Sequence, residues 1–154
     1  GTITAASSSS ISDGAAAAVL MGAETAAANG IAALARVVAQ ATHSHEPEWF
    51  TTAPIGAIEK VLAKAGWNVA DVDLFEINEA FAVVAMAPIR ELGIDHAKVN
   101  VNGGACALGH PIGASGARLV VTLVNALRSR GLRRGVASLC IGGGEATAIA
   151  IELI

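Results

Sequence analysis

Residues 135–153 read GVASLCIGGGEATAIAIEL. Apolar and β-branched residues fill both ends of this stretch, which predicts strands over residues 135–140 and 147–153. The three glycines Gly142–Gly144 lie between the two runs and allow the backbone to turn sharply. This stretch is therefore expected to form a β-hairpin.

Upstream of the hairpin, helical and strand patterns alternate. The clearest helix is predicted over residues 54–65, where an apolar stripe at helical spacing lies between Pro54 and Gly66. Further helices are predicted over residues 23–29, 79–92 and 117–130, and further strands over residues 31–42, 72–77 and 99–101. Helix is the second choice for residues 31–42, helix or strand stays open for residues 14–21, and residues 1–13, 43–47 and 102–116 are expected to be loops. This order predicts an α/β fold with a mixed sheet flanked by helices.

Composition excludes several classes of protein. The formal net charge of the 154 residues is -3 with no basic stripe, so a nucleic-acid partner is not expected. No apolar run reaches the length that spans a membrane, so no membrane partner is expected either. The two cysteines lack the paired spacing of a zinc site or a disulfide framework, which indicates a reducing compartment. A bacterial cytoplasmic location is expected, with an organelle as the alternative.

The start of the chain predicts a longer protein. The first residue is Gly1, and the sequence opens in the middle of a pattern without a targeting signal. We therefore expect the chain to be part of a larger polypeptide.

Three short segments place reactive side chains at the ends of predicted elements. They are residues 78–81 (NEAF), residues 102–116 (NGGACALGHPIGASG) and residues 140–144 (CIGGG). Loops that follow strands are where sites form in open α/β sheets. The three segments are therefore the candidate site.

His110 and Cys140 are the strongest individual candidates. His110 stands between Gly109 and Pro111, and imidazole is the side chain best suited to exchange a proton near neutral pH. Cys140 ends a predicted strand, and its thiol is a nucleophile or a proton shuttle if a neighbour such as His110 lowers its pKa. A small buried residue is the alternative for Cys140. The glycines that follow it can present N–H groups to an oxyanion.

Other polar residues favour structural interpretations. Asn78 precedes a predicted helix, so its spacing favours a helix N-cap, with Glu79 in the first turn. Cys106 is expected to be a packed small residue. His43 and His45 are placed in an exposed loop without a third ligand, so no metal site is expected.

At these segments the chain resembles the thiolase family, most closely its acetyl-CoA acetyltransferase (acetoacetyl-CoA thiolase) branch. The opening residues 1–5 and residues 12–17 are similar to the stretch before the last strand of the family's N-terminal domain. The resemblance implies that residues 1–31 are the end of that domain, with a loop, a helix and its last strand. Residues 32–154 would then form the C-terminal thiolase domain.

The resemblance also implies catalytic roles. His110 would activate the nucleophilic cysteine and, with a water held by Asn78, form the oxyanion hole for the acetyl-CoA thioester. Cys140 would move a proton on and off the acetyl-CoA methyl carbon, and the backbone N–H of Gly142 would contribute to a second oxyanion hole. The acylated cysteine of the family belongs to an N-terminal segment that this chain lacks, so neither Cys106 nor Cys140 would take that role.

The substrates implied are acetyl-CoA, acetoacetyl-CoA or another 3-ketoacyl-CoA, and free CoA, with no cofactor and no metal. The reaction would be thiolytic cleavage or the reverse Claisen condensation, in a homodimer or homotetramer. The residues that would contact substrate are Ser9, Ala80, Phe81 and Phe50. Residues 6–10 (ASSSS) depart from the family's common pattern, which puts the contact of Ser9 with the pantetheine arm in doubt.

Four other interpretations stay open. A non-catalytic CoA- or lipid-binding relative would keep the fold without the chemistry. A papain-like cysteine hydrolase would need another chain order of Asn78, His110 and Cys140. A nucleotide-binding domain would need a helix after Gly142–Gly144, and a ketoacyl synthase would be expected to carry a histidine at position 78.

Overall fold

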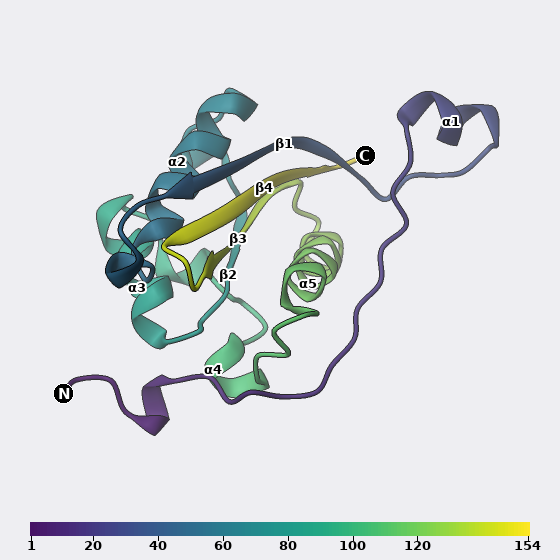
Figure 1. The fold of residues 1–154 in the computed structure, drawn as a ribbon. Coiled ribbons are helices and arrows are strands. Elements are labelled where there is room, and N and C mark those ends of the chain that lie inside the picture. Colours follow the sequence, from purple (N-terminus) through teal and green to yellow (C-terminus); the bar gives the residue numbers. More distant parts are fainter.

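The computed structural model describes all 154 residues and contains one four-stranded sheet. Its order is β1 (Ala35–Ser44), β4 (Glu145–Leu153), β3 (Arg134–Ile141) and β2 (Leu74–Ile77). β3 pairs antiparallel with β4 and parallel with β2, while β1 pairs antiparallel with β4 (Figure 1). The predicted hairpin and the predicted mixed sheet are both confirmed.

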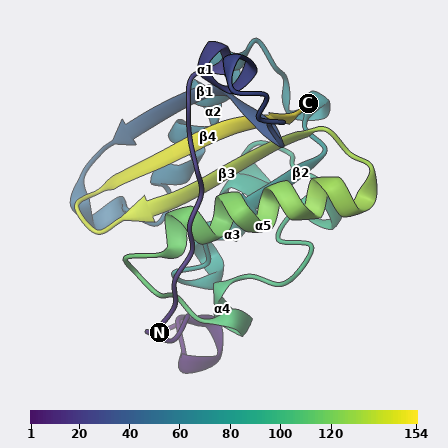
Figure 2. The same ribbon diagram turned by 90° about the vertical axis from the view of Figure 1, so that its right-hand side faces the viewer.

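Helices cover both faces of the sheet. α2 (Ala53–Ala65) and α3 (Ala82–Glu91) lie on one face, and α5 (Ser115–Arg130) lies on the other (Figures 1 and 2). Alternate residues of each strand face opposite sides, so each face builds its own apolar cluster. Phe75 and Val136 belong to the cluster under α2, whereas Leu74 and Ala137 belong to the cluster under α5.

The two long helices end in the same way. The glycine after each has a positive φ, 68° at Gly66 and 66° at Gly131. The residue after each glycine, Trp67 or Leu132, donates its N–H to a carbonyl of the last turn. This is the hydrogen-bond pattern of a Schellman C-cap. A further glycine, Gly135 on β3, lets α5 pack closely, since a Cβ there would lie 2.7 Å from the side chain of Leu123.

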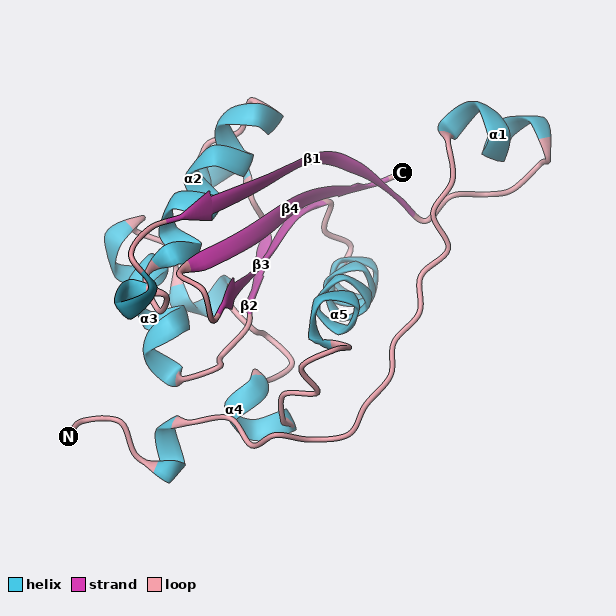
Figure 3. Ribbon diagram, viewed as in Figure 1, coloured by secondary structure: helices cyan, strands magenta, loops and turns pink.

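Residues 1–34 form an arm along the outside of the α5 face (Figures 1 and 2). The arm holds the short helix α1 (Ala23–Ala28), which confirms the helix predicted there, and Ala26 is its single buried residue. The last strand expected within residues 1–31 is not observed, because no neighbouring strand pairs with the arm (Figure 3). Residues 14–21 are neither helix nor strand, and β1 begins at Ala35 rather than at residue 31.

Other local predictions need correction. Residues 99–101 form no strand, since only an isolated bridge joins Val99 to Phe75. The helix predicted from residue 79 begins at Ala82, and the loop predicted over residues 102–116 contains the one-turn helix α4 (Ala105–Leu108). No helix has the length and apolar character needed to cross a membrane.

Candidate functional site

The site is built where two parallel strands end side by side. Asn78 directly follows β2, and its backbone N–H donates to the carbonyl oxygen of Ser138 on β3 at 2.9 Å. Cys140 lies two residues further along β3. Parallel pairing therefore brings the segments 78–81 and 140–144 to the same edge of the sheet.

Asn78 is buried, with 1% of its surface exposed, and its side chain meets the second candidate loop. Its amide nitrogen Nδ2 lies 3.3 Å from Nε2 of His110, so the structure brings these two predicted residues together. The N-cap interpretation of Asn78 is wrong, because α3 begins at Ala82 with Phe81 as its N-cap. Glu79 also precedes the helix. Its carboxylate accepts hydrogen bonds from Asn100 Nδ2 and the Cys106 backbone.

The backbone around His110 is fixed by the arm. The N–H of His110 donates to the carbonyl of Ser10 at 2.8 Å, and an isolated bridge joins His110 to Ile11. Gly109 has a φ of 94°, and any side chain there would collide with Ser12. The glycine before the histidine is therefore required both by its conformation and by the close approach of the arm.

His110 is arranged to be a neutral imidazole. Its Nδ1 lies 2.6 Å from Oγ of Ser115, the first residue of α5. Burial lowers the pKa of His110 below its ordinary value, and the positive charge of Arg118 lowers it further. The uncharged ring can accept a proton at neutral pH.

The buried carboxyl group of Glu76 and the partly exposed guanidinium of Arg118 form an ion pair next to Asn78. Arg118 on α5 places Nη2 3.4 Å from Asn78 Oδ1 and Nη1 3.5 Å from Oε2 of Glu76 on β2. Burial raises the pKa of Glu76 to about 7, against the opposing effect of Arg118. Sequence reasoning missed both residues. The available signal was a lone carboxylate in an otherwise apolar strand.

Cys140 lies half-buried at the end of β3. Burial raises the pKa of its thiol, so His110 does not lower this pKa as an activated thiol would require, and no hydrogen bond joins the two side chains. The following glycines form the turn of the hairpin, and Gly142 has open space where a Cβ would stand. Cys106 also has a raised pKa, through burial and then the nearby carboxylate of Glu79.

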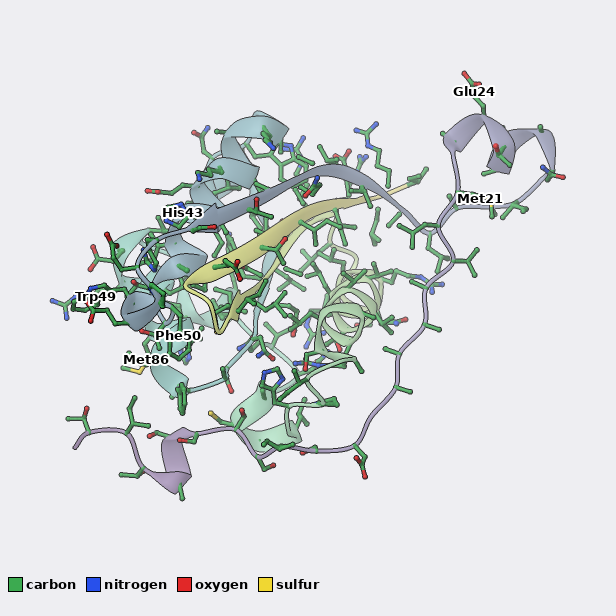
Figure 4. All side chains as sticks on the ribbon, viewed as in Figure 1. Met21, Glu24, His43, Trp49, Phe50 and Met86 are labelled. Atoms are coloured by element: carbon green, nitrogen blue, oxygen red, sulfur yellow. The ribbon has the colours of Figure 1, made fainter.

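The residues expected to contact substrate lie on the segment after Asn78 and beside it. Ser9 donates to the carbonyl of Ala80 from its backbone N–H at 3.1 Å and from its hydroxyl at 3.0 Å. The rings of Phe50 and Phe81 meet edge to face with centroids 6.3 Å apart. Phe50 and the neighbouring Trp49 lie at the α3 end of the molecule (Figure 4).

His43 and His45 do not join this site. His43 lies in β1 rather than in an exposed loop, and its Nδ1 is buried without a hydrogen-bond partner. Nε2 of His45 is 2.8 Å from the carbonyl oxygen of Trp49. No group of three or more side chains is arranged to hold a metal ion.

A family model for the thiolase C-terminal domain matches residues 31–153. The chain belongs to the thiolase family. This thiolase chain is 53% identical over 152 residues to the acetyl-CoA acetyltransferase of Rhizobium meliloti, with 99% of the chain and 39% of that relative covered. It is 51% identical to the cytosolic acetyl-CoA acetyltransferase of Mus musculus, over 99% of the chain and 38% of that relative.

Solved structures agree with this assignment. The thiolase chain superposes on the crystal structure of the Bacillus anthracis acetyl-CoA acetyltransferase with a TM-score of 0.97 and 46% identity, covering 99% of this chain and 39% of that one. For human mitochondrial 3-ketoacyl-CoA thiolase the TM-score is 0.91 and the identity 38%, with 99% and 39% covered. The thiolase chain therefore spans about two fifths of the length of the curated relatives it matches.

Proposed function

We propose that this chain supplies the proton-transferring half of a thiolase catalytic centre. The reaction is cleavage of acetoacetyl-CoA or another 3-ketoacyl-CoA by CoA, or the reverse condensation of two acetyl-CoA molecules. The observation that carries the proposal is the contact between Asn78 Nδ2 and His110 Nε2 at the open edge of parallel strands. The nucleophilic cysteine is expected on a segment outside this chain.

In the acylation half-reaction, His110 acts as the base. Because its pKa is lowered, the neutral ring can take the proton of the nucleophilic thiol. The sulfur keeps the electron pair and attacks the thioester carbonyl. When the tetrahedral intermediate collapses, the C–S bond to CoA breaks and CoA leaves as its thiolate. The ring, now protonated at Nε2, and a water held by Asn78 then form the oxyanion hole for the thioester oxygen of the incoming acetyl-CoA. One such donor contributes about 3 kcal/mol to transition-state stabilisation.

In the condensation half-reaction, Cys140 is the acid and base. A thioester α-proton moves to the Cys140 thiolate, and the resulting carbanion attacks the acyl-enzyme carbonyl, so that a C–C bond forms and the C–S bond to the nucleophile breaks. The raised pKa of Cys140 supports this role, because it makes the thiolate a stronger base. The backbone N–H of Gly142 donates to the oxyanion formed on the acyl-enzyme.

The same edge supplies the substrate contacts. We assign Ser9 to the pantetheine arm of CoA and Ala80, Phe81 and Phe50 to the pocket around the acyl group. The contacts of Ser9 with Ala80 and of Phe50 with Phe81 support this placement. A solved thiolase from Ascaris suum in complex with coenzyme A, 45% identical with a TM-score of 0.91, is consistent with CoA as the ligand.

We infer the domain organisation, oligomeric state and location of the whole protein from the same relatives. Residues 1–31 are assigned to the end of the N-terminal thiolase domain and residues 32–154 to the C-terminal domain, which the match to residues 31–153 supports. Exposed apolar side chains such as Val19 and Leu20, 88% and 75% exposed, support burial against further protein, and we expect a homodimer or homotetramer. A cytoplasmic location is proposed, in line with the cytosolic mouse relative.

The test separates the two half-reactions in the full-length protein. Cys140→Ala should abolish condensation but leave an acetyl adduct after incubation with acetyl-CoA, as measured by intact mass spectrometry. His110→Ala should damage both steps. Cys106→Ala is the matched control, because Cys106 is also a partly buried thiol with a raised pKa, and it should leave both steps intact. Equal loss of both steps in Cys140→Ala, or full activity in both variants, would contradict the assignment, and CoA binding without turnover in the wild type would favour a non-catalytic CoA-binding role.

A further inference from the structure

The hydrogen bonds around His110 form a chain with a defined direction. It begins at Arg118, whose guanidinium carries five N–H donors and no acceptor. The atom of Asn78 that faces Nη2 of Arg118 at 3.4 Å must therefore be the carbonyl oxygen Oδ1. Arg118 thus fixes which way the Asn78 amide points, an orientation that the amide itself leaves open.

The orientation of the Asn78 amide in turn determines which nitrogen of the imidazole accepts a hydrogen bond. With Oδ1 held by Arg118, the NH₂ group of Asn78 faces Nε2 of His110 at 3.3 Å. An amide NH₂ can only donate, so Nε2 must be the acceptor and carry its lone pair. The ring proton of neutral His110 then lies on Nδ1.

The contacts of Nδ1 favour the same tautomer. Nδ1 lies 2.6 Å from Oγ of Ser115, and that hydroxyl donates to the carbonyl of Pro111 at 3.0 Å. Since the single hydroxyl proton is used toward Pro111, the oxygen of Ser115 is free to accept from Nδ1–H. Both neighbours of the ring therefore favour the same tautomer.

Glu76 holds Arg118 in place, but the geometry of this pair is poor and it contributes little to the stability of the fold. Glu76 is 1% exposed, and its closest approach to Arg118 is 3.5 Å, while Glu76 Oε1 and Arg118 Nε are buried without partners. A buried pair with poor geometry commonly destabilises the fold relative to apolar residues of the same size. The only other side chain that either residue bonds is Asn78. The pair is therefore better explained by its effect on the site than by its effect on stability.

We propose that Arg118, anchored by Glu76, is a positioning residue that holds His110 as the Nδ1–H tautomer with the Nε2 lone pair at the site. The inference deepens the proposed function, on which its catalytic meaning rests. When the nucleophilic S–H bond breaks and an N–H bond forms at Nε2, Asn78 can no longer donate to that nitrogen. Its NH₂ is released to hold water as negative charge develops on the thioester oxygen.

The decisive measurement is the protonation pattern of the His110 ring. Magic-angle-spinning NMR of the full-length protein, labelled with 15N at histidine and assigned by the signals lost in His110→Gln, distinguishes protonated from unprotonated Nδ1. The wild type should be the Nδ1–H tautomer above the pKa of His110. An Nε2–H tautomer in the wild type would overturn the proposal without any variant.

Variants at position 118 test the cause. Arg118→Met removes the donor, so the Asn78 amide can rotate and the tautomer ratio should fall by about fivefold, the ratio that corresponds to one ordinary net hydrogen bond. Arg118→Lys keeps a donor-only cation and should retain the wild-type tautomer. Arg36→Met is the matched control, since it breaks the Arg36–Glu152 pair at the opposite end of the sheet and should leave His110 unchanged.

Kinetics separate this inference from the proposed function. Arg118→Met should lower kcat in both half-reactions with little change in KM, and Arg118→Lys should recover most of it. An unchanged tautomer in Arg118→Met would overturn the positioning role even if His110 proves to be the base. An Nδ1–H tautomer together with full activity of His110→Ala would overturn the proposed function and, with it, the catalytic role of Arg118.

Discussion

Ser115 Oγ lies 2.6 Å from His110 Nδ1, the shortest side-chain contact that the imidazole makes. Ser115 is the first residue of α5, so this helix carries the partner that orients the ring. This contact holds Nδ1 of the ring, while Nε2 faces Asn78. A substitution of Ser115 therefore tests how far the orientation of the ring controls proton transfer.

Ser115→Ala should lower kcat of the full-length enzyme by about fivefold in both half-reactions, because a lost hydrogen bond of this kind is worth about 1 kcal/mol. KM should change little, since the hydrogen bonds of the Ser115 hydroxyl go to His110 Nδ1 and the Pro111 carbonyl and not to the residues assigned to substrate contacts. Steady-state kinetics of cleavage and condensation measure both values. Ser129→Ala is the control, because Ser129 also lies on α5 and donates to a carbonyl of the preceding turn, but far from the ring. An unchanged kcat for Ser115→Ala would contradict the orienting role.

Glu76 should make the stability of the chain fall as pH rises. Its pKa is raised from 4.5 to about 7, so between these values the folded state binds more protons than the unfolded state. Stability from this group is complete below pH 4.5 and is lost as pH rises through about 7. The whole loss is about 3 kcal/mol. Arg118, Glu79 and Arg130 are the charged groups that act on the carboxyl.

Glu76→Gln cannot ionise and should remove this dependence. Urea unfolding of the 154-residue chain at pH 5 and pH 8 gives the comparison. The wild type should lose stability relative to Glu76→Gln between the two pH values. His110 acts in the opposite direction, because its pKa is lowered, but it is present in both proteins and cancels from the difference. Parallel pH profiles for the two proteins would contradict the raised pKa of Glu76.

The side chain of Asn100 should be important for the stability of the chain, because it holds the end of β2. It has a positive φ of 48°, and its side chain bonds both the N–H and the carbonyl of Ile77, each at 2.8 Å. Asn100→Ala should destabilise the chain by about 2–4 kcal/mol, because two buried backbone groups lose their partners. Asn102→Ala is the control, since its exposed side chain accepts only from Arg130. Urea unfolding should show a change of less than about 0.5 kcal/mol for the control.

The two thiols of this chain should be unreactive at neutral pH. Burial raises the pKa of both Cys106 and Cys140, so the thiolate fraction is small. The purified 154-residue chain is therefore expected to show no cleavage of acetoacetyl-CoA, and alkylation of both thiols by iodoacetamide should be slower at pH 7 than alkylation of a free cysteine. Rapid alkylation at pH 7 or measurable turnover would show that one thiol is activated within this chain.

The sequence by itself determined the fold class and the order of the main helices and of the four sheet strands. Apolar periodicity predicted the helices near residues 54–65 and 117–130 and the closing hairpin, each within a few residues of its observed bounds. These signals are local, since side-chain spacing along one element decides which face is buried. The three candidate segments were also visible, because glycine and polar residues interrupt apolar runs at strand ends.

Only the tertiary structure decided what those residues contact. Local spacing favoured an N-cap for Asn78, but its side chain meets His110, 32 positions away, and Arg118, 40 positions away. The buried pair of Glu76 and Arg118 depends on α5 lying across β2, which neither segment specifies alone. A pattern along one element reports which side is apolar, whereas the direction of a hydrogen bond depends on which distant donor is brought against it.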